Sequence, residues 1–137
     1  MNKPPIILLI EDRESDALLF REALAAVSFT GDLRVAVNAR EAREYMEGRG
    51  MFLDRLQFPL PNLIVCDLHM AGSATDFLKW LRDHANFKRV PVVLWSGHLG
   101  AAPMNTLFEM GGRRCFVKSA DFQKLCSDVQ AMLGHLN

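Results

Sequence analysis

Acidic, hydroxyl and amino side chains stand directly after four short apolar segments of this sequence. The five residues concerned are Glu11, Asp12, Asp67, Ser96 and Lys118. Three carboxylates brought together would repel one another, and a hard divalent cation would relieve the repulsion because Mg²⁺ prefers oxygen ligands and bridges readily to phosphate. A hydroxyl and an ammonium group nearby would add a hydrogen-bond donor and a point charge. Together, these residue types indicate a site for a metal and a phosphoryl group.

These side chains can meet only if the apolar segments form neighbouring parallel strands. Continuous apolar runs are typical of strands buried on both faces, and the predicted strands span 6–10, 33–37, 63–66, 91–95 and 115–117. Helical patterns separate them, so the chain alternates strand and helix. This alternation predicts right-handed crossovers and one parallel sheet covered by helices on both faces. Ligands of such sheets bind at the carboxyl ends of the strands, where the five residues stand.

The helical segments are predicted from apolar residues that recur at steps of three and four. The first helix is expected to bury Leu19, Phe20, Ala23, Leu24 and Val27, and the last to bury Phe122, Leu125, Val129, Met132 and Leu136. Asn38 is a predicted cap for a helix that starts at Ala39. Another helix is expected to begin near Pro103 and to end at Gly111 and Gly112.

Composition limits the function classes. The chain has 137 residues, which fits one domain, and its 16 basic and 16 acidic residues cancel. A formal charge of zero argues against nucleic-acid binding through bulk positive charge. The longest apolar run, at 6–10, is far short of the roughly 20 residues of a membrane span, and no signal peptide is recognisable. Three cysteines without a C-x-x-C pair are expected to be reduced thiols in a cytoplasmic protein.

Four stretches resemble the receiver domain of bacterial two-component response regulators. Residues 7–12 resemble its first strand and acidic pair, and 63–68 resemble the strand that holds the phospho-accepting aspartate. Residues 90–97 resemble the strand that ends in Ser or Thr before a small residue, and 116–118 the strand that ends in lysine. The resemblance implies one CheY-like domain over 1–137 without an output domain. Its α/β fold would be flavodoxin-like, (βα)5, with a doubly wound five-stranded parallel sheet in the order 2-1-3-4-5.

The resemblance also implies a role for each site residue. Three residues would act on the phosphoryl group: Asp67 as phosphoacceptor, Ser96 and Lys118. The implied ligands of Mg²⁺ (or Mn²⁺) are Glu11, Asp12, Asp67 and the backbone carbonyl of His69. The phosphoryl group would be bordered by His69, Gly97 and His98, which would modulate its lifetime. The simpler interpretation of the two histidines is that they are solvated loop residues. Within the family, the chain looks most similar to stand-alone regulators associated with bacterial phytochrome kinases.

The leading hypothesis is therefore a single-domain response regulator that is not a dedicated enzyme. A sensor histidine kinase, in this subgroup a bacteriophytochrome, would phosphorylate it, and slow self-dephosphorylation would follow. The alternative is a receiver-like interaction module that is not phosphorylated. Ser119 after the lysine, where proline is usual, and Cys115 at the usual position of a switch aromatic favour this alternative slightly. An aspartyl phosphatase is disfavoured because His69 stands where a second aspartate is expected.

Several apolar residues are candidates for partner surfaces. Leu18 would contact the kinase, although single exposed leucines are common. A homodimer through the fourth helix, fifth strand and fifth helix would use Leu107, Phe108, Met110 and Phe122, unless these residues belong to the core. Phe116 is expected to point into the core, away from the face of Cys115. The segment 49–61 is unusually apolar and is either a packed extension or a contact surface. The downstream target is not identifiable, and no direct contact with nucleic acid or membrane is expected.

Overall fold

The computed structural model describes residues 3–69, 73–97, 109 and 111–137. Its strands are β1 (Ile6–Ile10), β2 (Asp32–Ala36), β3 (Leu63–Cys66), β4 (Val92–Ser96) and β5 (Gly112–Val117). Its helices are α1 (Glu14–Ala26), α2 (Ala39–Glu47), the short 3-10 helix η1 (Gly50–Phe52), α3 (Ala74–Asp83) and α5 (Phe122–Leu133). The expectations for His98, Pro103, Leu107, Phe108 and Met110 lie outside the described residues.

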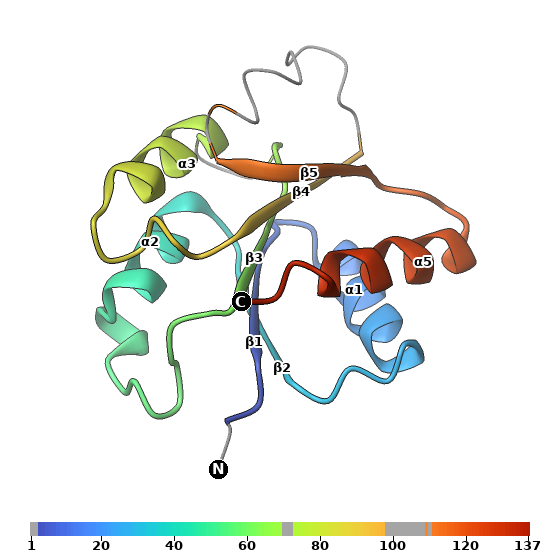
Figure 1. Cartoon of the computed structure of the whole chain (residues 1–137), viewed down its shortest axis with the longest axis horizontal. Coiled ribbons are helices and arrows are strands. Elements are labelled where there is room, and N and C mark those ends of the chain that lie inside the picture. Colours follow the sequence, from blue (N-terminus) through green and yellow to red (C-terminus); the bar gives the residue numbers. More distant parts are fainter. Residues whose placement is uncertain (1–2, 70–72, 98–108, 110) are drawn as a thin grey trace.

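The five strands form one parallel sheet in the order β2-β1-β3-β4-β5. Figure 1 shows α1 and α5 on one side of the sheet and α2 and α3 on the other. This arrangement confirms the predicted fold class and strand order. The register pairs Ile10 with Cys66, and Cys66 with Leu94, so these strands end side by side at one edge of the sheet.

Two apolar cores lie on the two faces of the sheet, which explains why whole strands are apolar. In β1, Leu8 and Ile10 belong to the core beneath α2 and α3, whereas Ile7 and Leu9 belong to the core beneath α1 and α5. The same alternation separates Cys115, which packs against the first core, from Phe116, which is buried in the second. The expected opposite orientation of these two residues is therefore confirmed.

Helix ends agree with the sequence signals in part. Asn38 caps α2 by accepting a hydrogen bond from the backbone N–H of Glu41, as predicted. Gly48 ends that helix with a φ of 68°, a left-handed conformation that glycine adopts at low cost. Glu109 is helical, Gly111 has a left-handed φ of 98° and Gly112 begins β5, so the predicted helix end at this glycine pair is confirmed. The predicted start of that helix near Pro103 lies outside the described residues.

Two residues expected in helical cores are partly exposed. Leu19 on α1 is 41% exposed and Phe122 at the start of α5 is 40% exposed, whereas Phe20, Leu24 and Leu125 are buried. The predicted faces are therefore too wide. Periodicity gives the direction of a buried face, but its width depends on how closely the neighbouring helix or strand approaches.

The apolar segment between α2 and β3 is both packed and exposed. Tyr45, Phe52 and Phe58 form a cluster of three ring contacts, with centroids 5.0–6.1 Å apart. The guanidinium of Arg55 donates to the carbonyl of Tyr45 at 2.7 Å and so ties the segment to α2. Three neighbouring side chains are more than two-thirds exposed: Met51, Leu53 and Leu56.

None of the helices in the described part of the chain combines the length and the apolar character that a membrane span requires.

Candidate functional site

Sheet hydrogen bonds continue one residue beyond the strands and fix the residues that follow them. The N–H of Glu11 donates to the carbonyl of Ala36 at 2.9 Å, and the N–H of Asp67 donates to Ile10 at 3.1 Å. The N–H of Lys118 donates to the carbonyl of Ser96 at 2.8 Å. The polar residues after β1, β3 and β5 are therefore held at the same sheet edge by backbone hydrogen bonds that extend the strand pairing.

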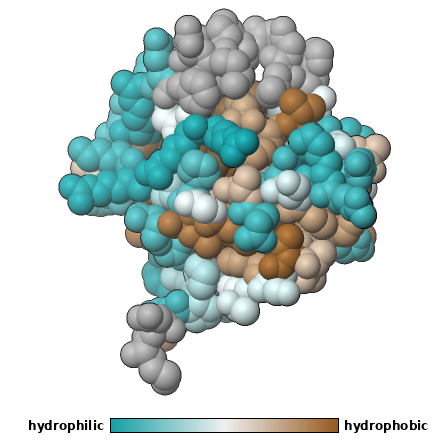
Figure 2. Space-filling view, turned by 45° about the vertical axis from the view of Figure 1, so that its right-hand side comes forward, coloured by the Kyte–Doolittle hydropathy of each residue, from teal (hydrophilic) through white to brown (hydrophobic). Residues whose placement is uncertain are grey.

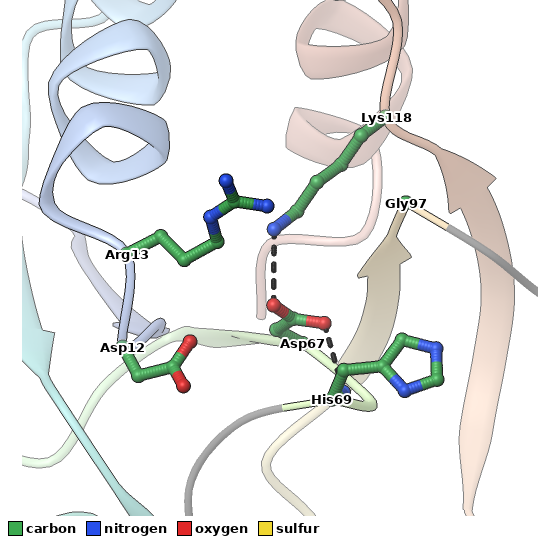
Figure 3. Close-up of a pocket in the computed structure, with 6 residues that line it drawn as sticks. All are labelled: Asp12, Arg13, Asp67, His69, Gly97 and Lys118. Carbon is green, nitrogen blue, oxygen red and sulfur yellow. Dashed lines mark hydrogen bonds and ion pairs between the residues drawn. The ribbon is translucent and has the colours of Figure 1, made fainter.

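The ammonium group of Lys118 lies at the centre of the site. Its Nζ donates to Glu11 Oε1 at 2.5 Å, to Asp16 Oδ2 at 2.8 Å and to Asp67 Oδ2 at 2.9 Å. Figure 3 shows the lysine reaching across the site to Asp67. The same Nζ lies 4.8 Å from the ring centroid of Trp95. One cation thus neutralises part of the charge of three carboxylates.

Asp16 is a site residue that the sequence argument did not identify. It lies in the first turn of α1, where acidic residues commonly stabilise the helix dipole, so its sequence position gave no specific signal. Its spacing of four residues from Asp12 was the only indication that it could face the same edge. In the structure, one of its oxygens accepts a hydrogen bond from Lys118.

Glu11, Asp12 and Asp67 form a cluster suited to a divalent cation. Each offers a carboxylate oxygen, and these oxygens lie within 4.8 Å of one another. Glu11 and Asp67 are 1% and 2% exposed, whereas Asp12 is exposed. An all-oxygen ligand set on a solvent-facing edge matches Mg²⁺ or Mn²⁺, which retain water ligands. The residues present therefore fit the expected metal, while the expected role of the His69 carbonyl stays a prediction.

Burial and charge change the acid–base behaviour of the site. Burial raises the pKa of Glu11 from 4.5 to about 7, and the negative charge of Asp67 adds to this effect. Hydrogen bonds from Lys118 and from the Arg13 N–H act in the opposite direction. Burial alone would lower the pKa of Lys118, but hydrogen bonds to Asp16, Glu11 and Asp67 raise it above its ordinary value. Lys118 is therefore a permanent cation.

Asp67 combines burial with access to a cavity. Its Oδ1 accepts a hydrogen bond from the His69 N–H at 2.9 Å, and its Oδ2 accepts the bond from Lys118. The cavity has a volume of about 520 Å³ and is lined by Asp12, Arg13, Asp67, His69, Gly97 and Lys118 (Figure 3). A carboxylate oriented by two donors at the base of an open cavity can act as a nucleophile toward an entering phosphoryl group.

The remaining candidate residues lie around this centre. Ser96 is completely buried at the end of β4, and its neighbour Gly97 lines the cavity. The peptide bond between Lys118 and Ser119 is trans. His98 lies outside the described residues, so its expected modulatory role stays a prediction.

Two candidate partner residues, Leu18 on α1 and Phe122 on α5, lie on the side of the sheet that carries these helices, where Figure 2 shows apolar side chains between polar patches. Leu18 is 56% exposed and lines a second cavity, of about 490 Å³, together with Glu11, Asp12 and Val37. Phe122 is partly exposed, whereas the residues expected to join it in a dimer, Leu107 and Phe108, lie outside the described residues. The placement of Leu18 beside the acidic pair is consistent with a surface near the site.

No protein-family model and no curated protein matches this chain. Among solved structures, the chain is similar to response regulator RPA3017 in red light signalling of R. palustris, with 25% identity and a TM-score of 0.86. The match covers 93% of this chain and 90% of that one. The Mn²⁺-bound form of response regulator Rcp1 matches with 25% identity and a TM-score of 0.81, covering 93% and 91% of the two chains.

The bacteriophytochrome response regulator RtBRR is 25% identical, with a TM-score of 0.80 over 96% of this chain and 78% of that one. The phosphorylated cyanobacterial phytochrome response regulator RcpA shares the fold with a TM-score of 0.84 at 23% identity, covering 98% and 97% of the two chains. The chain therefore has the fold of a response regulator receiver domain, and its structural neighbours include stand-alone regulators of phytochrome signalling.

Proposed function

We propose that residues 1–137 form a single-domain response regulator that accepts a phosphoryl group on Asp67 from a sensor histidine kinase. The observation that carries this proposal is the position of Asp67. Its carboxylate opens into a cavity, accepts a hydrogen bond from Lys118 and lies within a cluster of three carboxylates. A protein that signalled only through its outer surface would gain nothing from burying these charges, because burying unneeded charge destabilises the fold.

In the proposed transfer, a carboxylate oxygen of Asp67 attacks the phosphorus of the kinase phosphohistidine. An O–P bond forms, the N–P bond breaks, and the departing imidazole takes up a proton from solvent. Lys118 moves from pairing with the Asp67 carboxylate to pairing with the phosphoryl oxygens, and Ser96 donates its hydroxyl to one of them. Glu11, Asp12, Asp67 and the His69 carbonyl would hold Mg²⁺ or Mn²⁺. The bound metal would neutralise charge on the transferred group.

The phosphoryl group then leaves by hydrolysis. Water attacks phosphorus, inorganic phosphate departs and the Asp67 carboxylate is restored, so the protein carries a transient signal and does not act as a dedicated enzyme. The output is a changed binding surface toward a downstream protein or a second copy of the chain. The similarity to RPA3017 and RtBRR supports a bacteriophytochrome as the kinase. The three free thiols fit a cytoplasmic location.

Incubation with acetyl phosphate and Mg²⁺, followed by intact mass measurement, tests the proposal. We expect a mass increase of one phosphoryl group that requires the metal and is lost in Asp67→Asn. Asp83→Asn removes an exposed carboxylate at the end of α3 and is the matched control that should remain modifiable. Circular dichroism shows whether each variant is folded. Absence of modification in the folded wild-type protein would refute the proposal and favour an unphosphorylated interaction module.

A further inference from the structure

Arg13 is a cavity residue that the phosphoacceptor proposal leaves without a role. It directly follows the acidic pair and occupies the N-cap position of α1, but its side chain makes no capping hydrogen bond. Its backbone N–H donates to Glu11 Oε2 at 3.1 Å, which anchors the residue to the buried acid. The side chain is 73% exposed and lines the same cavity as Asp67 and Lys118. The backbone is therefore fixed, while the guanidinium can reorient.

The guanidinium lies on the Lys118 side of the cavity. Figure 3 shows it directed from α1 toward the ammonium group of Lys118, above the carboxylate of Asp67. Its Nε is 4.0 Å from Asp16 Oδ2, the oxygen that also accepts the hydrogen bond from Lys118. Asp16 therefore lies between two cations and reduces their mutual repulsion. Without this carboxylate, two like charges directed at one cavity would be unfavourable.

The ion pair with Asp16 does not by itself explain this position. An ion pair at the 4.0 Å limit, with an arginine that is 73% exposed, contributes little to stability, because solvent screens it and side-chain entropy opposes it. Lys118, in contrast, is already shared by three carboxylates. Phosphorylation would replace a single negative charge on Asp67 by nearly two and would add three acceptor oxygens. The acceptors would then exceed what Lys118 alone can satisfy.

We propose that Arg13 is a second cationic ligand of the phosphoryl group, binding its oxygens from the α1 side while Lys118 binds from the β5 side. The inference rests on the proposed phosphoacceptor function of Asp67. Guanidinium groups suit this role because their planar donors match phosphate geometry, and a lysine at the same position would supply only a point charge. Arg13 would therefore select a tetrahedral anion in the cavity without being needed for the fold or for metal binding.

Binding of beryllium fluoride in the presence of Mg²⁺ tests the inference, because this probe forms a tetrahedral analogue of the phosphoryl group on a carboxylate. Trp95 lies beside Lys118 and provides a fluorescence signal. We expect Arg13→Ala to weaken beryllium fluoride binding by about tenfold, as for the loss of one charge-assisted hydrogen bond. Arg13→Lys should recover part of the loss. Arg89→Ala removes an equal charge from an exposed position just before β4, at the opposite edge of the sheet, and should change the affinity less than about twofold.

Mg²⁺ affinity without beryllium fluoride separates a specific role from a general defect. Arg13→Ala should bind Mg²⁺ as tightly as the wild type or slightly more tightly, because the variant lacks a neighbouring cation. A variant with a distorted site would bind Mg²⁺ more weakly. Equal beryllium fluoride affinities of the wild type and Arg13→Ala would overturn the role of Arg13 and leave the phosphoacceptor function intact. The same conclusion would follow if Arg13→Ala lost Mg²⁺ binding to the same extent as beryllium fluoride binding. If the wild type bound Mg²⁺ but no beryllium fluoride, the proposed function itself would fail.

Discussion

Glu11 makes the stability of the metal-free protein depend on pH in an unusual direction. Its side chain is 1% exposed, and burial raises its pKa from 4.5 to about 7. The native state therefore retains a proton that the unfolded chain releases between these two values. Stability contributed by this group is present below pH 4.5 and is lost as the pH rises toward 7. Most buried, ion-paired carboxylates have depressed pKa values and give the opposite slope.

The magnitude follows from the two pKa values. Integrating the proton-binding difference from about pH 5 to about pH 8 gives a loss of roughly 2–3 kcal/mol in the free energy of unfolding. Lys118 contributes no slope in this window, because its ordinary pKa is 10.5 and its pKa in the native protein is higher still. The comparison with Glu11→Gln isolates the effect, since glutamine fills the same space and does not titrate.

Urea denaturation in EDTA at several pH values measures the effect. We expect the wild type to lose roughly 2–3 kcal/mol more than Glu11→Gln between about pH 5 and about pH 8. Saturating Mg²⁺ should reduce this difference, because a cation favours the ionised carboxylate that it binds. Glu22→Gln changes an exposed glutamate on α1 and should behave like the wild type. Parallel pH profiles of wild type and Glu11→Gln in EDTA would refute the assignment of a raised pKa.

Three further results are expected. Lys118→Met should destabilise the metal-free protein at neutral pH by about 3 kcal/mol, because it leaves buried carboxylates without their cation, and Mg²⁺ should restore part of the loss in urea titrations. Leu18→Asp should slow phosphoryl transfer from a kinase but leave modification by acetyl phosphate unchanged; equal slowing of both would contradict a docking role. The double variant His69→Asn/His98→Asn should change the lifetime of the phosphoryl group, because His69 lines the cavity beside Asp67. Equal lifetimes in the wild type and the double variant would exclude this modulation.

The sequence was most informative where the fold restricts the chain to few arrangements. Parallel strands joined by helices must align their carboxyl ends, so the residues after 6–10, 63–66 and 115–117 could be expected at one edge without knowledge of their contacts. Asp16 could not be found in this way. Its contact with Lys118 depends on the rotation of the first turn of α1 about its axis, which is set by the packing of Phe20 and Ala23 in the core.

Exposed positions were predicted less well for a related reason. Leu19 and Phe122 were predicted to be buried from the same helical spacing as Leu24 and Leu125. Only Leu24 and Leu125 are buried. The pattern contains no information about where the neighbouring element stops. A similar limit applies to 49–61, where Phe52 is buried and Met51 is 73% exposed although both are large apolar residues in the same turn.

Although the chain as a whole is neutral, the site has an excess of negative charge. This excess affects the binding of the metal, of a proton and of the phosphoryl group. Four carboxylates surround Lys118 and Arg13, namely Glu11, Asp12, Asp16 and Asp67, so two negative charges are unmatched. A divalent cation matches this excess, and in its absence protonation of Glu11 relieves part of it. A phosphoryl group on Asp67 would add negative charge again and so would draw the two cations toward the cavity. Lys118 stands at the start of the β5–α5 connection and Arg13 at the start of α1, so both cations are attached to the two helices that pack against each other.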